Sequence, residues 1–218
     1  MKYEAVIWDL DGTLMNTSEG VLRSVAYTIE TLGQPPLPRE KMERFIGPPI
    51  VQSFVKICNM NPEQAAHAAD IFRMRYSTVD LMAAIVYPGI FDVLKQLKQS
   101  DVKIGVATYK REDYARKLLE EKGISDYCQS IRGADFENRK TKQDILLECL
   151  EELRAGSRQP LKAVLIGDTE HDASGAYQAG VPFLAVTYGY GFRTPEDVNQ
   201  FAHIGVAEKP DDLMKFLK

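Results

Sequence analysis

The chain has few features that would place it outside the ordinary soluble globular proteins. It has three cysteines in 218 residues, and their scattered positions (Cys58, Cys128 and Cys149) give neither a disulfide framework nor a metal-binding spacing. No apolar run is long enough to cross a bilayer, and the N-terminus shows no signal-peptide pattern. With a formal net charge of −4, the chain lacks the basic excess of a protein that binds nucleic acid. We therefore expect a cytoplasmic monomer or homodimer, without a membrane or a nucleic-acid polymer as partner.

Hydrophobic patterning divides the chain into two kinds of segment. Residues 16–83 show helical periodicity without a convincing strand, whereas apolar strands and amphipathic helices alternate after residue 84. Alternation of this kind predicts a doubly wound parallel sheet in an α/β fold. We expect a core of residues 1–15 and 84–218, interrupted by an inserted α-helical domain over 16–83.

The pattern also predicts individual elements. Strands are expected at 5–8, 102–107, 131–133, 163–166 and 183–186. Helices are expected at 18–32, 38–45, 50–57, 62–83, 90–97, 114–122, 145–153 and 173–179, with further short helices opening at 194–196 and 211–213.

Two carboxylates stand one residue apart at the end of the first strand. Asp9 and Asp11 lie in the sequence Asp-Leu-Asp-Gly-Thr, directly after the apolar run 5–8. Ligands of open α/β sheets bind beyond the carboxyl ends of strands, so both side chains are expected in that crevice. Like charges this close need a cation between them or a shared proton. A divalent metal beside a carboxylate indicates phosphoryl chemistry.

This pentapeptide resembles the signature of the haloacid dehalogenase superfamily, whose members are mostly metal-dependent phosphatases. The resemblance implies three further blocks in a fixed order. The first is Thr108, after the strand 102–107, which in the family donates its hydroxyl to a phosphate oxygen. Tyr109 and Lys110 follow it where close relatives carry Asn-Lys, and we regard all three as substrate-binding candidates. Taken alone, Thr108 would simply be a β-branched strand end.

The second block is a lysine ahead of a helix, within residues 138–142 (Asn-Arg-Lys-Thr-Lys). In the family this lysine neutralises the phosphate oxygens and the nucleophile together. Lys140 fits best, because Asp144 then falls where relatives carry an acidic residue, and Thr141 replaces a common proline. Lys142 is the competing candidate, and we expect it to be a solvated helix residue.

The third block, Gly-Asp-Thr-Glu-His-Asp over residues 167–172, resembles the family's Gly-Asp-x-x-x-Asp pattern. Asp168 would complete the oxygen cage that Mg²⁺ requires. Asp172 would act on the metal through water or by orienting Lys140. His171 is expected to be a loop residue that faces solvent.

The resemblance implies a mechanism and a cofactor. Asp9 would attack phosphorus and form an aspartyl-phosphate, while Asp11 would act as acid and then as base. Mg²⁺ would be held by the Asp9 carboxylate, the Asp11 carbonyl and Asp168, with Asp172 beside them. Thr108 and Lys140 would hold the phosphoryl oxygens.

The insertion resembles the small helical cap of this superfamily, which excludes water and reads the substrate beyond its phosphate. Residues 44–49 (Arg-Phe-Ile-Gly-Pro-Pro) are similar to a cap loop of phosphoglycolate phosphatase-like members. Arg44 and Gly47 are therefore substrate-binding candidates, although Arg44 fits a surface arginine equally well.

The main hypothesis is a phosphatase that acts on a small phosphorylated metabolite. Phosphoglycolate, a nucleoside monophosphate, pyrophosphate and a sugar phosphate all remain open as substrates. A phosphosugar mutase is an alternative, disfavoured by Thr13, where those enzymes carry Val. Dehalogenases lack the second aspartate, Asp11 here. Signalling receiver domains carry the phosphorylated aspartate on a later strand and have no long insertion.

Overall fold

The computed structural model describes residues 1–137, 139–156 and 159–218. Asn138, which opens the predicted lysine block, lies outside the described residues. The chain divides into a core unit, Met1–Met15 with Val86–Lys218, and a helical unit, Asn16–Ile85. The helical unit begins at the residue expected from the sequence and ends at residue 85, two residues later than expected. Within the described residues, no helix combines the length and the apolar character needed to span a membrane.

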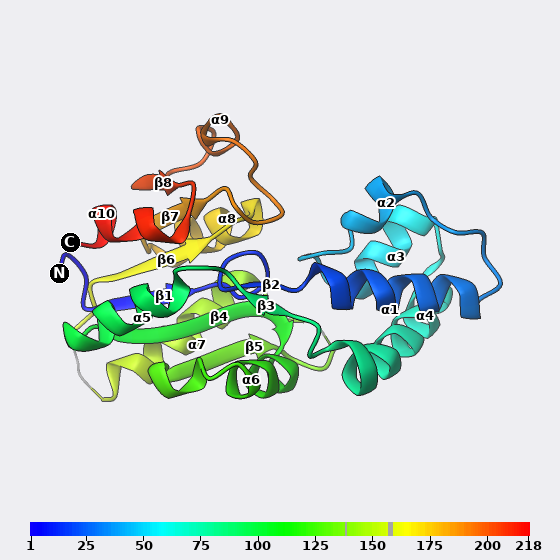
Figure 1. Ribbon diagram of the computed structural model, residues 1–218, viewed down its shortest axis with the longest axis horizontal. Coiled ribbons are helices and arrows are strands. Elements are labelled where there is room, and N and C mark those ends of the chain that lie inside the picture. Colours follow the sequence, from blue (N-terminus) through cyan, green and yellow to red (C-terminus); the bar gives the residue numbers. More distant parts are fainter. Residues whose placement is uncertain (138, 157–158) are drawn as a thin grey trace. The chain divides into compact units, whose positions relative to one another are not determined.

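A six-stranded parallel sheet forms the centre of the core unit (Figure 1). Its strands, in spatial order, are β5 (Ser130–Ala134), β4 (Lys103–Arg111), β1 (Ala5–Trp8), β6 (Ala163–Gly167), β7 (Phe183–Val186) and β8 (Gly205–Ala207). The order of the strands changes direction at β1. The chain adds β4 and β5 on one side of β1 and then β6, β7 and β8 on the other side. The predicted doubly wound α/β fold is thereby confirmed, and β8 is a strand that the pattern analysis missed.

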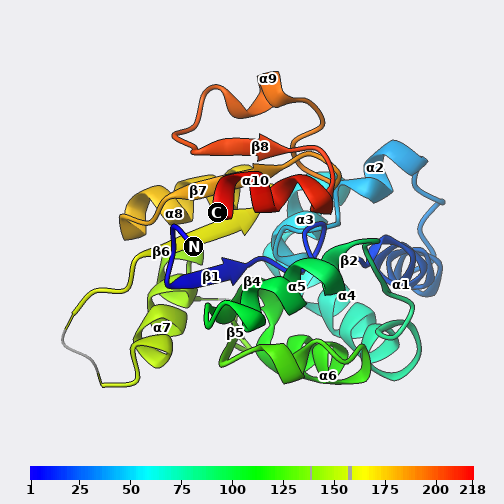
Figure 2. The same ribbon diagram turned by 60° about the vertical axis from the view of Figure 1, so that its left-hand side comes forward.

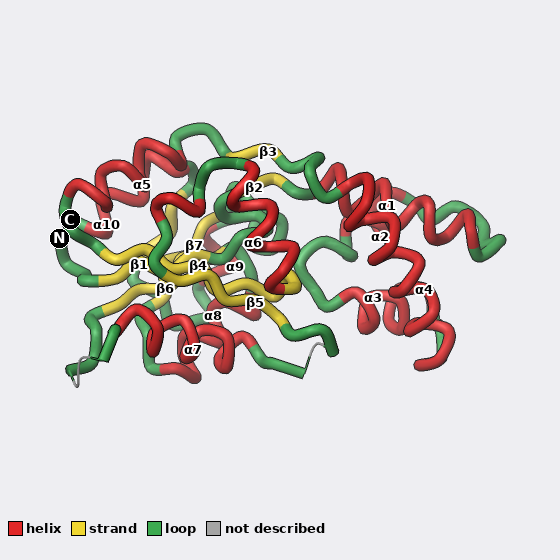
Figure 3. Tube along the Cα trace, turned by 90° about the horizontal axis from the view of Figure 1, so that it is seen from below, coloured by secondary structure: helices red, strands yellow, loops and turns green. Residues whose placement is uncertain are grey.

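Helices cover both faces of this sheet. They are α5 (Ile90–Gln99), α6 (Glu112–Glu121), α7 (Lys142–Arg154), α8 (Glu170–Ala179), α9 (Pro195–Val198) and α10 (Leu213–Leu217). Figure 3 shows α5 and α10 on one face and α7 and α8 on the other. The two termini lie side by side (Figure 2), where the Lys2 backbone N–H donates to the Leu217 carbonyl at 2.9 Å.

The central strand positions the first carboxylate. All four residues of β1 are buried, as expected for a strand that is covered on both faces. Trp8, its last residue, is in register with Val106 of β4 and Ile166 of β6. The chain therefore leaves the sheet at Asp9, at the same edge where β4 and β6 end.

Side chains of α6 satisfy the outer edge of β5. The Arg116 guanidinium donates to the Ile131 carbonyl at 2.6 Å, and the Gly133 N–H donates to Glu112 at 3.2 Å. Exposed strand edges attract other chains, so these bonds help to keep β5 from pairing further.

The helical unit contains α1 (Ser18–Thr31), α2 (Arg39–Glu43), α3 (Ile50–Cys58) and α4 (Pro62–Arg75). Asn61 caps α4 by accepting the Gln64 N–H at 2.9 Å, and Pro62 occupies the first helical position, as predicted. The short strands β2 (Met15–Asn16) and β3 (Ile85–Val86) pair with one another where the chain passes between the two units.

The helix that opens at Pro62 is shorter than predicted. It ends at Arg75 and continues as a π-helical turn over Tyr76–Asp80. The buried Asp80 carboxylate accepts hydrogen bonds from Arg75 at 2.9 Å and from Ser24 at 3.0 Å. A buried charge requires such partners, and the wider turn places Asp80 where they can reach it.

Candidate active site

Three carboxylates converge where β1 and β6 end. Asp9 follows β1, Asp168 follows β6, and Asp172 lies in the first turn of α8. Each offers an oxygen within 4.8 Å of the others, and all three residues are buried. Burial and the charges of neighbouring aspartates raise the pKa of Asp9 well above its ordinary value, although Lys142 opposes the shift. Burial, with Asp172 next in importance, raises the pKa of Asp168 to about 7.

Lys142 lies among these carboxylates. Its Nζ is 2.6 Å from Asp9 Oδ1 and 2.5 Å from Asp172 Oδ1, and its side chain is 3% exposed. Burial by itself would lower the pKa of Lys142, but Asp172 and Asp9 outweigh it, so the pKa lies above its ordinary value. The ammonium therefore stays charged and links the nucleophile candidate to α8.

This geometry corrects the expectation for the site lysine. Lys140 Nζ pairs with Glu148 at 2.7 Å, whereas Lys142, expected in solvent, is buried beside Asp9. The error came from the start of α7, expected at residue 145 and found at Lys142. Thr141 is the N-cap and forms a reciprocal capping box with Asp144, so Asp144 belongs to the cap and does not mark the alignment of Lys140.

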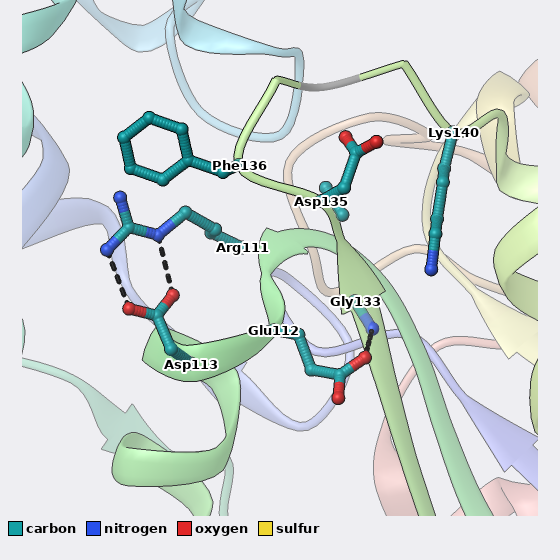
Figure 4. A pocket seen from close by; sticks show the side chains of 8 residues that line it. Arg111, Glu112, Asp113, Gly133, Asp135, Phe136 and Lys140 are labelled. Carbon is teal, nitrogen blue, oxygen red and sulfur yellow. Dashed lines mark hydrogen bonds and ion pairs between the residues drawn. The ribbon is translucent and has the colours of Figure 1, made fainter.

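Lys140 instead lines a separate cavity of about 330 Å³ in the core unit. Figure 4 shows its side chain across that cavity from Phe136 and Arg111. The two ends of the Arg111 guanidinium each donate to an oxygen of Asp113, at 2.6 Å and 2.6 Å. The side chains of Lys140 and Lys142 therefore point into different environments, although only one residue separates them.

The other predicted residues near the strand ends have defined partners. The Asp11 side chain is mostly buried, and its Oδ1 lies 2.9 Å from Lys110 Nζ. Thr108 is buried at β4, where its Oγ1 accepts the Lys110 N–H at 3.1 Å. The Tyr109 hydroxyl accepts the Lys142 N–H at 2.9 Å, so this side chain contacts α7. Direct contact of Lys110 or Tyr109 with substrate stays a prediction.

The loop after β7 supplies partners that the sequence analysis missed. Asp168 Oδ2 accepts the backbone N–H groups of Tyr190 at 2.7 Å and Gly191 at 3.2 Å. A Cβ on Gly189 would overlap that same oxygen, so only glycine fits there. The signal was a Gly-Tyr-Gly segment just after a strand that neighbours β6, which is where a sheet of this type places its ligands.

Comparison with known proteins decides the family. The model of the haloacid dehalogenase-like hydrolase family matches residues 6–186, which span most of the chain. The chain belongs to the haloacid dehalogenase-like hydrolase family. A crystal structure of a predicted phosphatase from Clostridium acetobutylicum has the same fold, with a TM-score of 0.88, 30% identity and coverage of 99% of this chain and 98% of that chain.

Relatives similar to this hydrolase carry different names. A 5'-nucleotidase of Pseudomonas aeruginosa is 30% identical over 93% of this chain and 91% of its own length. The phosphoglycolate phosphatase 1 of the same organism is 28% identical over 87% of this chain and 71% of its own. The tyrosine-protein kinase PtkA of Mycobacterium tuberculosis is 31% identical over 86% of this chain, which covers 63% of the kinase. Two of these names are phosphatases and the third is a kinase, so the names do not agree on one substrate.

The acidic cluster of this hydrolase suits a divalent metal ion. Burial, and after it the charges of neighbouring aspartates, raises the pKa of Asp9 and of Asp168, and a bound cation would favour their ionised forms. Carboxylate oxygens are the ligands that Mg²⁺ selects. Both oxygens of Asp172 already have partners, since Oδ1 contacts Lys142 and Oδ2 accepts the Thr169 hydroxyl at 2.6 Å. Asp168 also accepts hydrogen bonds at both oxygens, from the Thr13 hydroxyl and from the backbone N–H groups after β7, so these partners do not separate the three ligand candidates.

Two predicted residues lie in the helical unit. Arg44 is exposed and ends α2, and Gly47 has a φ of +100°, a backbone conformation that favours glycine. Gly47 makes the sharp turn before Pro48 and Pro49 possible. The roles of Arg44 and Gly47 toward a substrate stay predictions.

Proposed function

We propose that this hydrolase is a Mg²⁺-dependent phosphomonoesterase that acts on a small phosphorylated metabolite through an aspartyl-phosphate on Asp9. The observation that carries the proposal is the buried contact of Asp9 with Lys142, next to Asp168. A nucleophilic carboxylate, a fixed cation and a second carboxylate that can hold a metal are the parts that phosphoryl transfer needs.

The proposed reaction has two displacements at phosphorus. In the first, an oxygen of Asp9 forms a bond to phosphorus while the bond to the ester oxygen breaks, and Asp11 donates a proton to that oxygen. In the second, Asp11 takes a proton from water, whose oxygen attacks phosphorus. The bond to Asp9 then breaks, releasing inorganic phosphate and restoring both carboxyl groups.

The remaining residues would stabilise charge on the transferred group. Lys142 and the Thr108 hydroxyl would hold its equatorial oxygens, where negative charge spreads in the transition state. Asp172 would orient Lys142 through the 2.5 Å contact. Mg²⁺, held by Asp9 and Asp168, would supply positive charge against the phosphoryl oxygens.

The names of relatives and the insertion support a proposal for the substrate class. Names of relatives support a nucleoside monophosphate and phosphoglycolate, and the resemblance of the segment 44–49 to a cap loop supports phosphoglycolate. Pyrophosphate and hexose phosphates complete the set to be tested.

The test is phosphate release from these compounds by the purified full chain, with Mg²⁺ and with a chelator. We expect turnover that the chelator abolishes and that Asp9→Asn removes while the far-ultraviolet circular dichroism stays unchanged. Turnover by pure Asp9→Asn would refute the mechanism. Conversion of a hexose 1-phosphate to its isomer without phosphate release would assign the protein to the mutases.

A further inference from the structure

The proposed reaction requires the Lys142 ammonium to keep a fixed position beside Asp9. The structure holds this lysine by its ammonium, by its side-chain stem and by its backbone. Its ammonium contacts Asp9 and Asp172. Its side-chain stem passes over Gly175 of α8, where an added Cβ would lie only 2.7 Å from Lys142 Cγ. Its backbone N–H donates to the Tyr109 hydroxyl at 2.9 Å.

The backbone contact has a specific physical basis. Lys142 is the first residue of α7, and the first four N–H groups of a helix have no partner within it. The Thr141 hydroxyl accepts the N–H of Asp144. The N–H of Lys142 lies in a partly buried place, where its acceptor is the Tyr109 hydroxyl.

Tyr109 is well placed to hold this helix because it sits on β4, next to Thr108. Successive side chains of a strand point to opposite faces, and Tyr109 packs against the buried cluster that includes Ile145 and Leu146 of α7. The ring of His171 meets the Tyr109 ring edge-on at 5.7 Å, and Lys142 Nζ lies 5.8 Å from the Tyr109 ring centre. Two ring contacts and one hydrogen bond therefore define the position of the Tyr109 side chain.

We propose that Tyr109 is the positioning residue for Lys142: its hydroxyl fixes the first turn of α7 and so sets where the ammonium meets the phosphoryl group. This inference rests on the proposed function for its kinetic consequence.

The test variant is Tyr109→Phe, which removes the hydroxyl and keeps the ring. The matched control is Tyr177→Phe on α8, because Tyr177 is 76% exposed and its substitution makes the same chemical change away from the site. Thermal unfolding midpoints of all three proteins establish that each is folded at the assay temperature.

The first readout does not depend on activity. Amide hydrogen exchange of the peptide that contains Lys142 should be faster in Tyr109→Phe than in the wild type and in Tyr177→Phe, because the N–H loses its acceptor. Unchanged exchange would overturn the proposal, whether or not the protein is a phosphatase.

The second readout is kinetic. Loss of one hydrogen bond that orients a catalytic charge should lower kcat by about fivefold, equivalent to about 1 kcal/mol, with a smaller change in KM. If the substitution only unfolded part of the protein, the apparent kcat would fall in proportion to the unfolded fraction. Faster exchange with kcat equal to that of Tyr177→Phe would show that the bond exists without positioning Lys142, which overturns the proposal.

The two hypotheses fail in different ways. A wild-type protein that releases no phosphate from any tested ester contradicts the proposed function. In that case, binding of inorganic phosphate in the presence of Mg²⁺ replaces turnover as the readout. Equal phosphate affinity of the wild type and Tyr109→Phe would then overturn the role of Tyr109, and weaker binding by the variant would support it.

Discussion

Replacing Lys142 by methionine removes the ammonium from the acidic cluster while nearly preserving the volume of the side chain. Nζ lies 2.6 Å from Asp9 and 2.5 Å from Asp172, and the lysine and Asp172 side chains are almost completely buried. The variant therefore leaves two buried carboxyl groups facing one another without the cation between them.

The structure sets the size of the expected effects. Removing one partner of a buried ion pair costs about 3–5 kcal/mol of folding free energy, because the other charge stays desolvated. The Asp9 and Asp172 carboxyl groups stay buried in the variant, so we expect a loss within that range. In catalysis, loss of one fixed charge that faces the transition state lowers kcat by about 10²–10³-fold.

Lys140→Met is the matched control, because it makes the same substitution two residues away. The Lys140 and Glu148 side chains are 30% and 39% exposed, and exposed pairs contribute about 0–1 kcal/mol. Urea unfolding in chelator measures stability without any contribution from bound metal, and phosphate release with Mg²⁺ measures kcat. Wild-type turnover by Lys142→Met, with loss of turnover by Lys140→Met, would refute the assignment of Lys142.

Two further predictions concern the surroundings of the site. In Gly189→Ala the new methyl group would overlap Asp168 Oδ2. The affinity for Mg²⁺, measured by calorimetry, should therefore fall by about 10–100-fold. Unchanged affinity in a folded variant would contradict the role of Asp168. Hydrogen bonds from the Thr141 side chain and backbone hold the pKa of Asp144 below its ordinary value, so its contribution to stability is present above about pH 4 and is lost as the pH falls through its folded-state pKa. The wild type should therefore be more stable than Asp144→Asn at pH 6, with a difference in urea unfolding that shrinks on acidification; a constant difference would argue against an ionised cap.

Local sequence was sufficient for the residues that directly follow buried strands. A run of four apolar residues predicts a strand, and Asp9 then has to lie at its carboxyl end. The same argument applied to Asp168 after residues 163–166. Parallel strands bring these ends to one edge of the sheet, and the resemblance of both segments to the family's motifs implied that Asp9 and Asp168 share one site. The hydrolase family and the α/β fold followed from the same segments.

The lysine could not be chosen in this way. Lys140 and Lys142 differ by two residues, and the difference decides which side chain lies inside the first turn of α7. That choice depends on the capping box between Thr141 and Asp144 and on the space that Gly175 leaves on the neighbouring helix. The pattern of apolar residues began only at Ile145, so it carried no information about the first helical turn.

The sequence by itself determined the strand ends, the carboxylates that follow them and therefore the class of chemistry. Only the tertiary structure decided which cation contacts Asp9. It also decided that the Tyr109 hydroxyl accepts a hydrogen bond from the first residue of α7. The physical reason is the range of the interactions. Strand formation depends on neighbouring residues, whereas the position of Lys142 depends on contacts with Asp9, Tyr109 and Asp172, which lie between 30 and 133 residues away along the chain.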